Sequence, residues 1–173
     1  TIERIQSFAS IPVDEWHQVA IVYDGTTLFV YIDGLLDNSG NRAAPISTAD
    51  SFYIGAAGKN APTQHFMGNI DEVRIWDTNL TETQLRYIMN QEIEDNSNFV
   101  NGSYFSAQGI TPTKNDIATI PWSDLAGYYP LTTYTYTNTK DESGNGNTGA
   151  LRNLRTVDRQ TAPLPYQSQA NGD

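Results

Sequence analysis

The run EWHQVAIVYDGTTLFVYIDG, residues 15–34, constrains the fold of this chain more than any other segment. Residues 16–23 and 28–32 are rich in β-branched and aromatic side chains, and DGTT lies between them, with a glycine where a tight turn needs positive φ. Because apolar residues occupy both faces of the first run, we expect a β-hairpin in a sheet that is covered on both sides, as in a sandwich.

Further short strands are predicted along the chain, because apolar or alternating runs are bounded by Gly, Asn and Pro. They cover residues 1–9, 51–55, 68–76, 125–137 with an interruption at Pro130, and 149–154. Residues 96–124, which contain Pro112 and Pro121, are expected to be a linker or loop. The Pro-containing tail, residues 161–173, is expected to be a second linker.

One amphipathic helix is predicted in TETQLRYIMNQEIED, residues 81–95. Thr81 is placed to cap this helix, with Gln84 three residues later as its partner in a capping box. The apolar residues recur at helical spacing and predict a stripe that docks the helix on the surface of a sandwich: Leu85, Ile88, Met89 and Ile93.

The composition limits the classes of function. The chain has 173 residues, of which 38% are hydrophobic, enough for a domain with a core. Its formal charge of −10 repels phosphate backbones and anionic lipids, so nucleic-acid binding is not expected. The absence of Cys excludes disulfides, thiol catalysis and Cys-ligated zinc, and no apolar run is long enough to predict membrane insertion.

Three segments in order, WHQVAIVYDGTTLFVYIDG, SFYIG and GNIDEVRIWDTNLTETQLRYIM, resemble the second half of laminin-G-like domains of the concanavalin A-like lectin/glucanase superfamily. The resemblance covers about residues 1–93. It implies an all-β fold, an antiparallel jelly-roll β-sandwich, with one short surface helix near 81–93. It also implies a module that binds carbohydrate or protein, often with calcium at one rim.

A second block, LAGYYPL followed by DESGNGNTGAL, resembles the first strands of the same family, so the order of the two halves is inverted. DESGNGNTGALRNL is also similar to repeats in large surface adhesins of gliding bacteria of the Bacteroidetes type. Residues 125–160 could fold back on the sandwich of residues 1–95, begin a following module, or belong to a fragment whose other strands lie elsewhere. Fold-back is favoured, because unpaired sheet edges are costly.

Asp71 and Glu72 are the first candidate site residues. Consecutive residues of a strand point to opposite faces, so these two carboxylates are not expected to form a catalytic pair. The resemblance implies that one of them helps to hold a structural calcium ion at the edge of the sandwich. The alternative is a strand carboxylate that only accepts backbone N–H groups.

Asp141 is the second candidate, because D-x-S-x-N-G at residues 141–146 places oxygen ligands at alternate positions before a glycine. Arg152 stands where an EF-hand needs its bidentate Glu, so a complete EF-hand is excluded. The resemblance implies that Asp141 and Asn145 share one calcium ion with Asp71 or Glu72, provided that the chain folds back. The alternative is an Asx-rich turn.

Trp122, in the predicted loop IPWSDL, is expected to be exposed and to stack on a ligand, with Tyr128 and Tyr129 nearby in the sequence. Packing in the core is the alternative for the tyrosines. Trp16 and Trp76 lie within strand patterns and are expected to be core residues.

Neither histidine lies in a metal-ligand spacing, and the E-x-D-x-x-E motif of glucanases with this fold is not found. The sequence therefore predicts a non-enzymatic adhesion module that binds a glycan or a surface protein. It is expected to act outside the cell, at a bacterial cell surface, as part of a larger polypeptide or secreted assembly. A structural spacer or secretion-associated segment is the first alternative, and a glucanase-like enzyme is the second.

Overall fold

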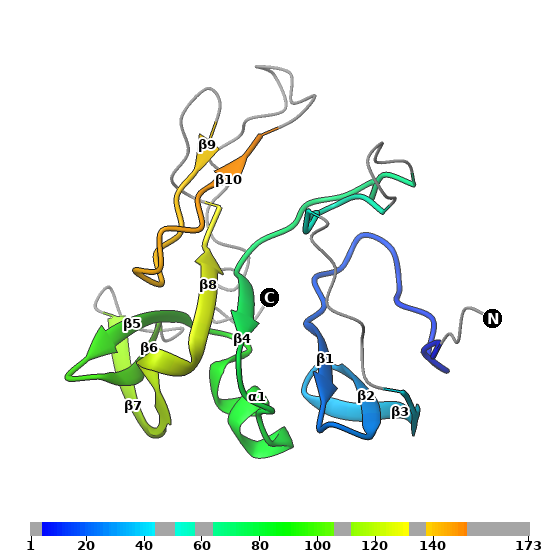
Figure 1. Ribbon diagram of the computed structural model, residues 1–173, viewed down its shortest axis with the longest axis horizontal. Helices are drawn as coiled ribbons and strands as arrows, with labels where there is room; N and C mark the ends of the chain where they lie inside the picture. Colours follow the sequence, from blue (N-terminus) through cyan, green and yellow to red (C-terminus); the bar gives the residue numbers. More distant parts are fainter. Residues whose placement is uncertain (1–4, 44–50, 58–63, 106–111, 132–137, 152–173) are drawn as a thin grey trace.

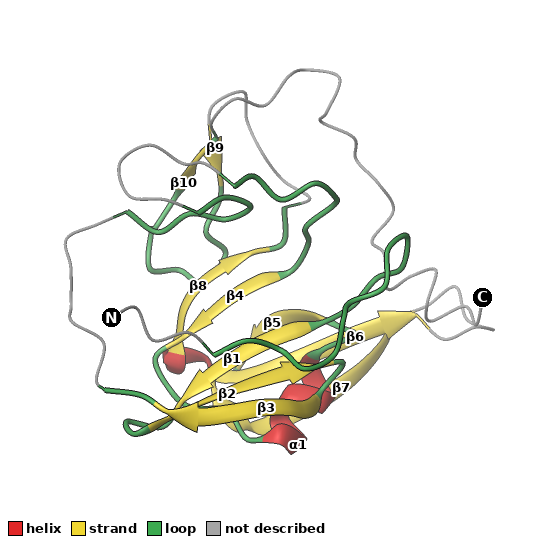
Figure 2. Ribbon diagram, turned by 90° about the vertical axis from the view of Figure 1, so that its right-hand side faces the viewer, coloured by secondary structure: helices red, strands yellow, loops and turns green. Residues whose placement is uncertain are grey.

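The computed structural model of the chain describes residues 5–43, 51–57, 64–105, 112–131 and 138–151. These residues form antiparallel strands and one α-helix (Figures 1 and 2), which confirms the predicted all-β class. In chain order the elements are β1 (Val19–Tyr23), β2 (Thr27–Ile32), β3 (Leu35–Asn41), β4 (Val73–Trp76), α1 (Glu82–Ile88), β5 (Glu92–Asn96), β6 (Phe99–Phe105), β7 (Pro112–Pro121), the 3-10 helix η1 (Trp122–Asp124), β8 (Leu125–Tyr129), β9 (Asn138–Thr139) and β10 (Gly149–Ala150).

The predicted hairpin forms β1 and β2, which pair antiparallel from Val19↔Ile32 to Tyr23↔Leu28. The Asp24 carboxylate accepts the backbone N–H groups of the two threonines that follow the turn glycine, and it fixes the turn in this way. β3 extends the sheet beyond β2, where the sequence predicted no strand. β2 ends at Ile32, and Asp33 and Gly34, which both have positive φ, form the tight turn into β3.

The helix is shorter than the sequence predicts. Thr81 and Gln84 form the predicted capping box, and α1 ends at Ile88. Residues 92–96 are strand β5, which pairs antiparallel with β6. Ile93 is buried from this strand rather than from the helix. The extended helix was therefore wrong, because the apolar spacing that Ile93 shares with the helical stripe also fits a half-buried strand.

The linker expected over residues 96–124 is wrong as well, because this segment contains β6 and β7. These strands pair antiparallel, and with β5 they form a three-stranded sheet in the order β5-β6-β7. Pro112 and Pro121 lie at the two ends of β7, which is an edge strand. An edge strand tolerates proline at its ends, where no N–H is needed by a neighbour.

β4 and β8 form a two-stranded antiparallel sheet, with Arg74 opposite Tyr128 and Ile75 opposite Gly127. The two sequence blocks in inverted order therefore lie side by side over these strands (Figure 1). β9 and β10 pair beyond β8 and flank the DESGNGNTG loop. The Glu142 N–H donates to the carbonyl of Tyr128 at 2.8 Å, which attaches the start of this loop to β8.

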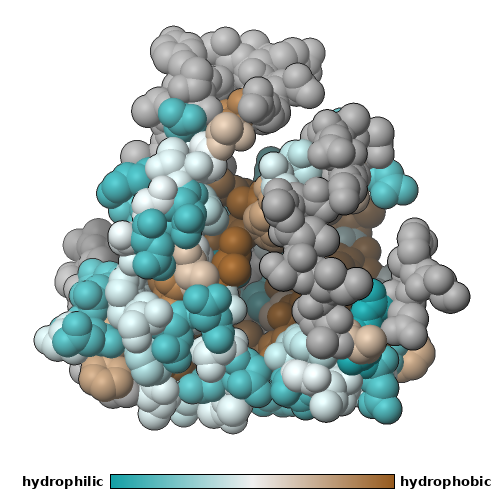
Figure 3. Space-filling model, in the orientation of Figure 1, coloured by the Kyte–Doolittle hydropathy of each residue, from teal (hydrophilic) through white to brown (hydrophobic). Residues whose placement is uncertain are grey.

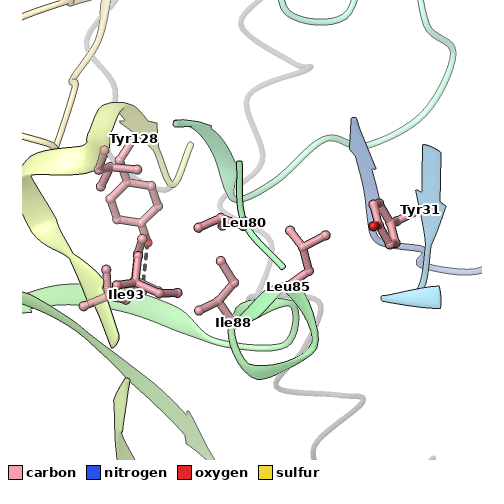
Figure 4. Close-up of a cluster of buried hydrophobic side chains, with 9 residues drawn as sticks. Tyr31, Leu80, Leu85, Ile88, Ile93 and Tyr128 are labelled. Carbon is pink, nitrogen blue, oxygen red and sulfur yellow. Dashed lines mark hydrogen bonds between the residues drawn. The ribbon is translucent and has the colours of Figure 1, made fainter. Parts of the chain in front are cut away.

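A buried apolar cluster connects the sheets through α1 (Figure 4). Leu85 and Ile88 of α1 lie with Leu80 between Tyr31 of β2 on one side and Tyr128 of β8 on the other. Three further members are almost completely inaccessible to solvent: Val100, Ile120 and Leu125. The helix therefore fills the space between the β1–β2–β3 sheet and the strands of the second half of the chain.

Several strand and core predictions differ from the structure. Residues 5–9 and 51–55 contain no strand, while residues 1–4, 132–137 and 152–173 lie outside the described part. Trp76 packs against the core as predicted, but Trp16, which precedes β1, is 37% exposed. No helix in the described ranges is long and apolar enough to cross a membrane.

Candidate functional site

The predicted carboxylates lie at a buried polar network around Arg74 of β4. The Arg74 guanidinium forms a salt bridge with Glu72, and it donates to the carbonyls of Gln91 and, at 2.6 Å, of Ile88. It also lies 5.7 Å from the ring centroid of Tyr128, close enough for a cation–π contact. Arg74 thus joins β4 to the end of α1, to the segment before β5 and to β8.

Tyr128 is the second centre of this network. Its hydroxyl donates to the carboxylate of Glu72 at 2.9 and 3.1 Å, and it accepts the backbone N–H of Ile93 at 3.3 Å. Burial and the neighbouring Glu72 raise the pKa of the Tyr128 hydroxyl, so it stays protonated and acts as a donor. Glu72 is therefore a structural anion held by one cation and one hydroxyl.

The sequence predicts Asp71 and Glu72 at consecutive positions of a strand, but both residues precede the strand. β4 begins at Val73, and Glu72 has a φ of 55°, in the left-handed region. Asp71 is half-buried, and its carboxylate accepts the N–H of Glu72 at 3.1 Å. Burial, together with the charge of Glu72, raises the pKa of Asp71 to about 6.

Asp141 is buried and organises the DESGNGNTG loop as an acceptor. Its carboxylate accepts the backbone N–H groups of Tyr128 (2.9 Å), Ser143 (3.0 Å) and Asn147 (2.9 Å). Burial opposes ionisation, but the hydrogen bonds from Ser143, Tyr128 and Asn147 outweigh it and hold the pKa of Asp141 below its usual value. This geometry is that of an Asx-type turn, the alternative considered for this motif.

Asn145 also faces the protein. Its side-chain amide donates to the carbonyl of Leu125 at 2.7 Å and to the hydroxyl of Ser143 at 3.2 Å. The indole N–H of Trp122 donates to the carbonyl of Ser143 at 3.0 Å. The loop is therefore fastened to η1 and β8 by side chains that the sequence suggested as ligand contacts.

Three of the four predicted calcium ligands, Glu72, Asp141 and Asn145, use their side chains in contacts within the protein. Both oxygens of Asp141 accept backbone N–H groups, and Asn145 uses its amide as a donor. The carboxylate of Glu72 is taken up by Arg74 and Tyr128. Within the described ranges, no three His, Cys, Asp or Glu side chains form a group suited to a metal. The carboxylate oxygens of Glu72 and Asp141 therefore accept hydrogen bonds from donors of the protein itself.

The predicted stacking residues are buried or half-buried. Tyr128 and Tyr129 are buried, and the Tyr129 hydroxyl donates to the carbonyl of Asn147 at 2.5 Å. Trp122 is half-buried and packs against the apolar core. The two tyrosines therefore follow the packing alternative, and Trp122 is less exposed than expected.

Other apolar side chains are exposed instead, in the segments between β3 and β4. Phe52, Phe66 and Met67 are 69%, 61% and 95% exposed. The two segments lie together, because the N–H of Phe66 donates to the carbonyl of Gly55 at 2.8 Å. For Phe66 a sequence signal was available, because Phe66 lies in a Gly- and Asn-containing segment outside every predicted strand. For Phe52 the signal was misleading, because residues 51–55 have a strand-like pattern and contain no strand.

The comparisons with known proteins bear on the first half of the chain. Residues 1–86 match the family model described as the concanavalin A-like lectin/glucanases superfamily. The match runs from the segment before β1 into α1, so it includes Phe52, Phe66 and the Glu72–Arg74 pair. It ends before β8 and the Asp141 loop.

One solved structure is similar to part of the chain. It is the crystal structure of an S-layer domain-containing protein (residues 221–444) from Clostridium thermocellum, with 24% sequence identity and a TM-score of 0.41. The similarity covers 48% of this chain, and the chain spans 43% of that structure. No curated protein matches the chain.

Proposed function

We propose that this chain is a non-enzymatic adhesion module of an extracellular, bacterial cell-surface protein, and that it binds a glycan or a protein. The observation that carries the proposal is the exposed apolar group of Phe52, Phe66 and Met67. This group lies in the segment that matches a superfamily whose description includes lectins. Contiguous exposed apolar side chains on a soluble protein are a common feature of binding surfaces.

The chemistry of these side chains suits both kinds of partner. The face of a phenylalanine ring packs on the C–H groups of a sugar ring, and it also anchors the centre of a protein interface. Met67 is flexible and adapts its shape to an apolar partner. The hydrogen bond between Phe66 and Gly55 holds the two segments together, which lowers the entropy lost on binding.

A glycan array, with and without calcium, tests this proposal directly. We expect binding by the unmodified chain and a loss of about tenfold or more for Phe66→Ala, since truncation of a central aromatic anchor costs on the order of 1–2 kcal/mol. Tyr87→Ala is the matched control, because Tyr87 is an exposed aromatic side chain on α1, outside the Phe52–Phe66 group. Calcium binding stays a prediction that the two metal conditions examine.

Two results would contradict the proposal. Binding that is equally weakened by Tyr87→Ala and Phe66→Ala would show that the Phe52–Phe66 group is not the contact surface. A complete absence of binding to glycans and to cell-surface preparations would instead favour a structural spacer without its own ligand.

A further inference from the structure

Among the described residues, β1 is an edge strand, and its outward backbone groups have no strand partner there. It pairs only with β2 within the described residues. The bond from the N–H of Asp33 to the carbonyl of Gln18 (2.8 Å) fixes which residues of β1 face β2. In an antiparallel pair this orientation alternates, so Ala20 and Val22 bond to β2, whereas Ile21 directs its N–H and C=O away from the sheet. Val19 and Tyr23 have the same orientation as Ile21.

The side chains at this edge are apolar. Val19 and Ile21 are 51% and 68% exposed, although both are β-branched residues that favour buried strands. Ala20 and Val22, on the opposite face, pack against the core that contains α1. In Figure 3, apolar side chains gather in a hollow between the two parts of the molecule that hold β1 and β4 in Figure 1. β1 therefore combines a regular free edge with exposed apolar side chains.

The other edge of the same sheet is protected. β3 contains polar residues and a register shift opposite Val30 and Tyr31. Asp37 accepts the N–H groups of Phe8 and Ala9 at 2.7 and 2.9 Å, so the segment before β1 runs across β3. Polar residues, irregular pairing and a covering segment are the means by which proteins prevent edge-to-edge association. β1 shows none of them within the described residues.

The charges beside β1 indicate the kind of strand that fits. Glu15 precedes the strand and Asp24 follows it, and both carboxylates are exposed. The backbone N–H groups of Thr27 and Thr26 lower the pKa of Asp24, which keeps it ionised. A second copy paired antiparallel through β1 would place Asp24 beside the start of its partner's β1, between chains that each carry a formal charge of −10. Repulsion between like charges disfavours a second copy of this chain beside β1. A strand with basic residues at its ends would be attracted instead.

We propose that β1 is a docking edge for an extended strand of a different polypeptide, with alternating apolar residues and Lys or Arg at its ends. The partner strand would add to the β1–β2–β3 sheet next to β1, as in other complexes formed by strand addition. Val19, Ile21 and Tyr23 would supply the main-chain hydrogen bonds, and the side chains of Val19 and Ile21 would pack on the partner. This surface is separate from the Phe52–Phe66 group, so the inference does not depend on the adhesion proposal.

Amide hydrogen exchange of the intact chain tests the inference with the peptide Lys-Val-Thr-Val-Thr-Val-Lys. We expect saturation with the peptide to slow exchange of the Val19, Ile21 and Tyr23 amides by about tenfold or more, because they gain hydrogen bonds. The amides of Ala20 and Val22 are already bonded to β2 and should change less. The same peptide with Glu at both ends should bind more weakly.

The variant Ile21→Pro provides a specific block. Proline removes the outward N–H of residue 21 and leaves the bonds between β1 and β2, so the fold should be retained. We expect a loss of peptide affinity of about tenfold or more. Ile21→Thr is the matched control, because it keeps the N–H and a β-branched side chain. Glycan binding should be the same in both variants.

The inference is overturned if the peptide does not slow amide exchange at Ile21 in the unmodified chain. This measurement does not depend on whether the Ile21→Pro variant folds. The inference is also overturned if a folded Ile21→Pro variant binds as well as Ile21→Thr, or if the Glu-ended peptide binds equally well. Sedimentation that shows a dimer which Ile21→Pro dissociates would identify a second copy as the occupant instead.

Discussion

Arg74 holds together the segments around β4, a role that the sequence did not predict. A buried guanidinium is tolerated because Glu72 neutralises it and the carbonyls of Ile88 and Gln91 accept its N–H groups. Glu72 in turn depends on the hydroxyl of Tyr128. These contacts make the Glu72–Arg74–Tyr128 network a unit in which removal of one member leaves another buried and unpaired.

Arg74→Met should therefore destabilise the chain strongly. Methionine retains much of the side-chain volume but leaves the Glu72 carboxylate without its cation, which costs about 3–5 kcal/mol when a buried pair is broken from one side. Urea unfolding followed by tryptophan fluorescence measures this cost. The double variant Arg74→Met with Glu72→Gln should lose less than the sum of the two single losses; simple additivity would show that the two residues do not interact.

Asp71 should make stability depend on pH in a defined direction. Its pKa of about 6 in the folded chain lies above its ordinary value of 3.8, so the folded state holds the proton more tightly than the unfolded state does. The stabilisation is complete below about pH 4 and is lost as the pH rises through about 6. Because Asp71 is partly exposed, we expect a change of only about 1 kcal/mol.

Asp71→Asn should remove this pH dependence and be more stable than the unmodified chain at pH 8. Thermal unfolding at pH 4 and pH 8 measures both effects. Asp77→Asn is the control for the loss of one carboxylate, since Asp77 is exposed and close by in the sequence. Equal pH profiles for Asp71→Asn and the unmodified chain would contradict the assigned position of Asp71.

At the scale of elements, the sequence predicts those structures whose causes are local. The β1–β2 hairpin follows from the turn residues, and the start of α1 follows from Thr81 and Gln84. β5 to β7 could not be found in the same way, because Ile93 fits both helical and strand spacing and the prolines of β7 lie at its ends. The partners of Glu72 were not predictable either, since Tyr128 is 56 residues away in the sequence.

Thr81→Ala tests the local cause of α1. The Thr81 hydroxyl accepts the N–H of Gln84 at 3.2 Å, and the side-chain oxygen of Gln84 accepts the N–H of Thr81 at 2.9 Å. Loss of the cap should cost about 1 kcal/mol of unfolding free energy, measured by denaturant titration. Thr83→Ala is the control, because Thr83 is exposed inside the helix and alanine is the better helix former. Equal stability of the two variants would contradict the capping role.

Asp141→Ala tests whether the DESGNGNTG loop is held by hydrogen bonds. Three backbone N–H groups lose their acceptor, and we expect a loss of about 1–3 kcal/mol. If hydrogen bonds alone hold the loop, addition of calcium or of a chelator leaves the melting temperature of the unmodified chain unchanged. A rise in melting temperature with calcium that Asp141→Ala abolishes would show instead that this carboxylate binds the ion.

At the scale of the whole molecule, the second half of the chain is joined to the first through β4 and β8. The two strands bring residues 73–76 and 125–129 together, and the Glu72–Arg74–Tyr128 network and the Leu85–Ile88 core lie beside them. This junction explains why Tyr128 and Tyr129 are buried rather than available to a ligand. Among the described residues, the exposed Phe52–Phe66 group and the edge of β1 are the surfaces that we propose for partners.

Nuclear Overhauser effects between backbone protons of β4 and β8 test this junction most directly. We predict cross-strand contacts in the register Val73–Tyr129 and Ile75–Gly127, together with slow amide exchange along β8. The absence of these contacts, with rapid exchange of the β8 amides in an otherwise folded chain, would show that residues 125–129 do not pair with β4 and would contradict the structure at its centre.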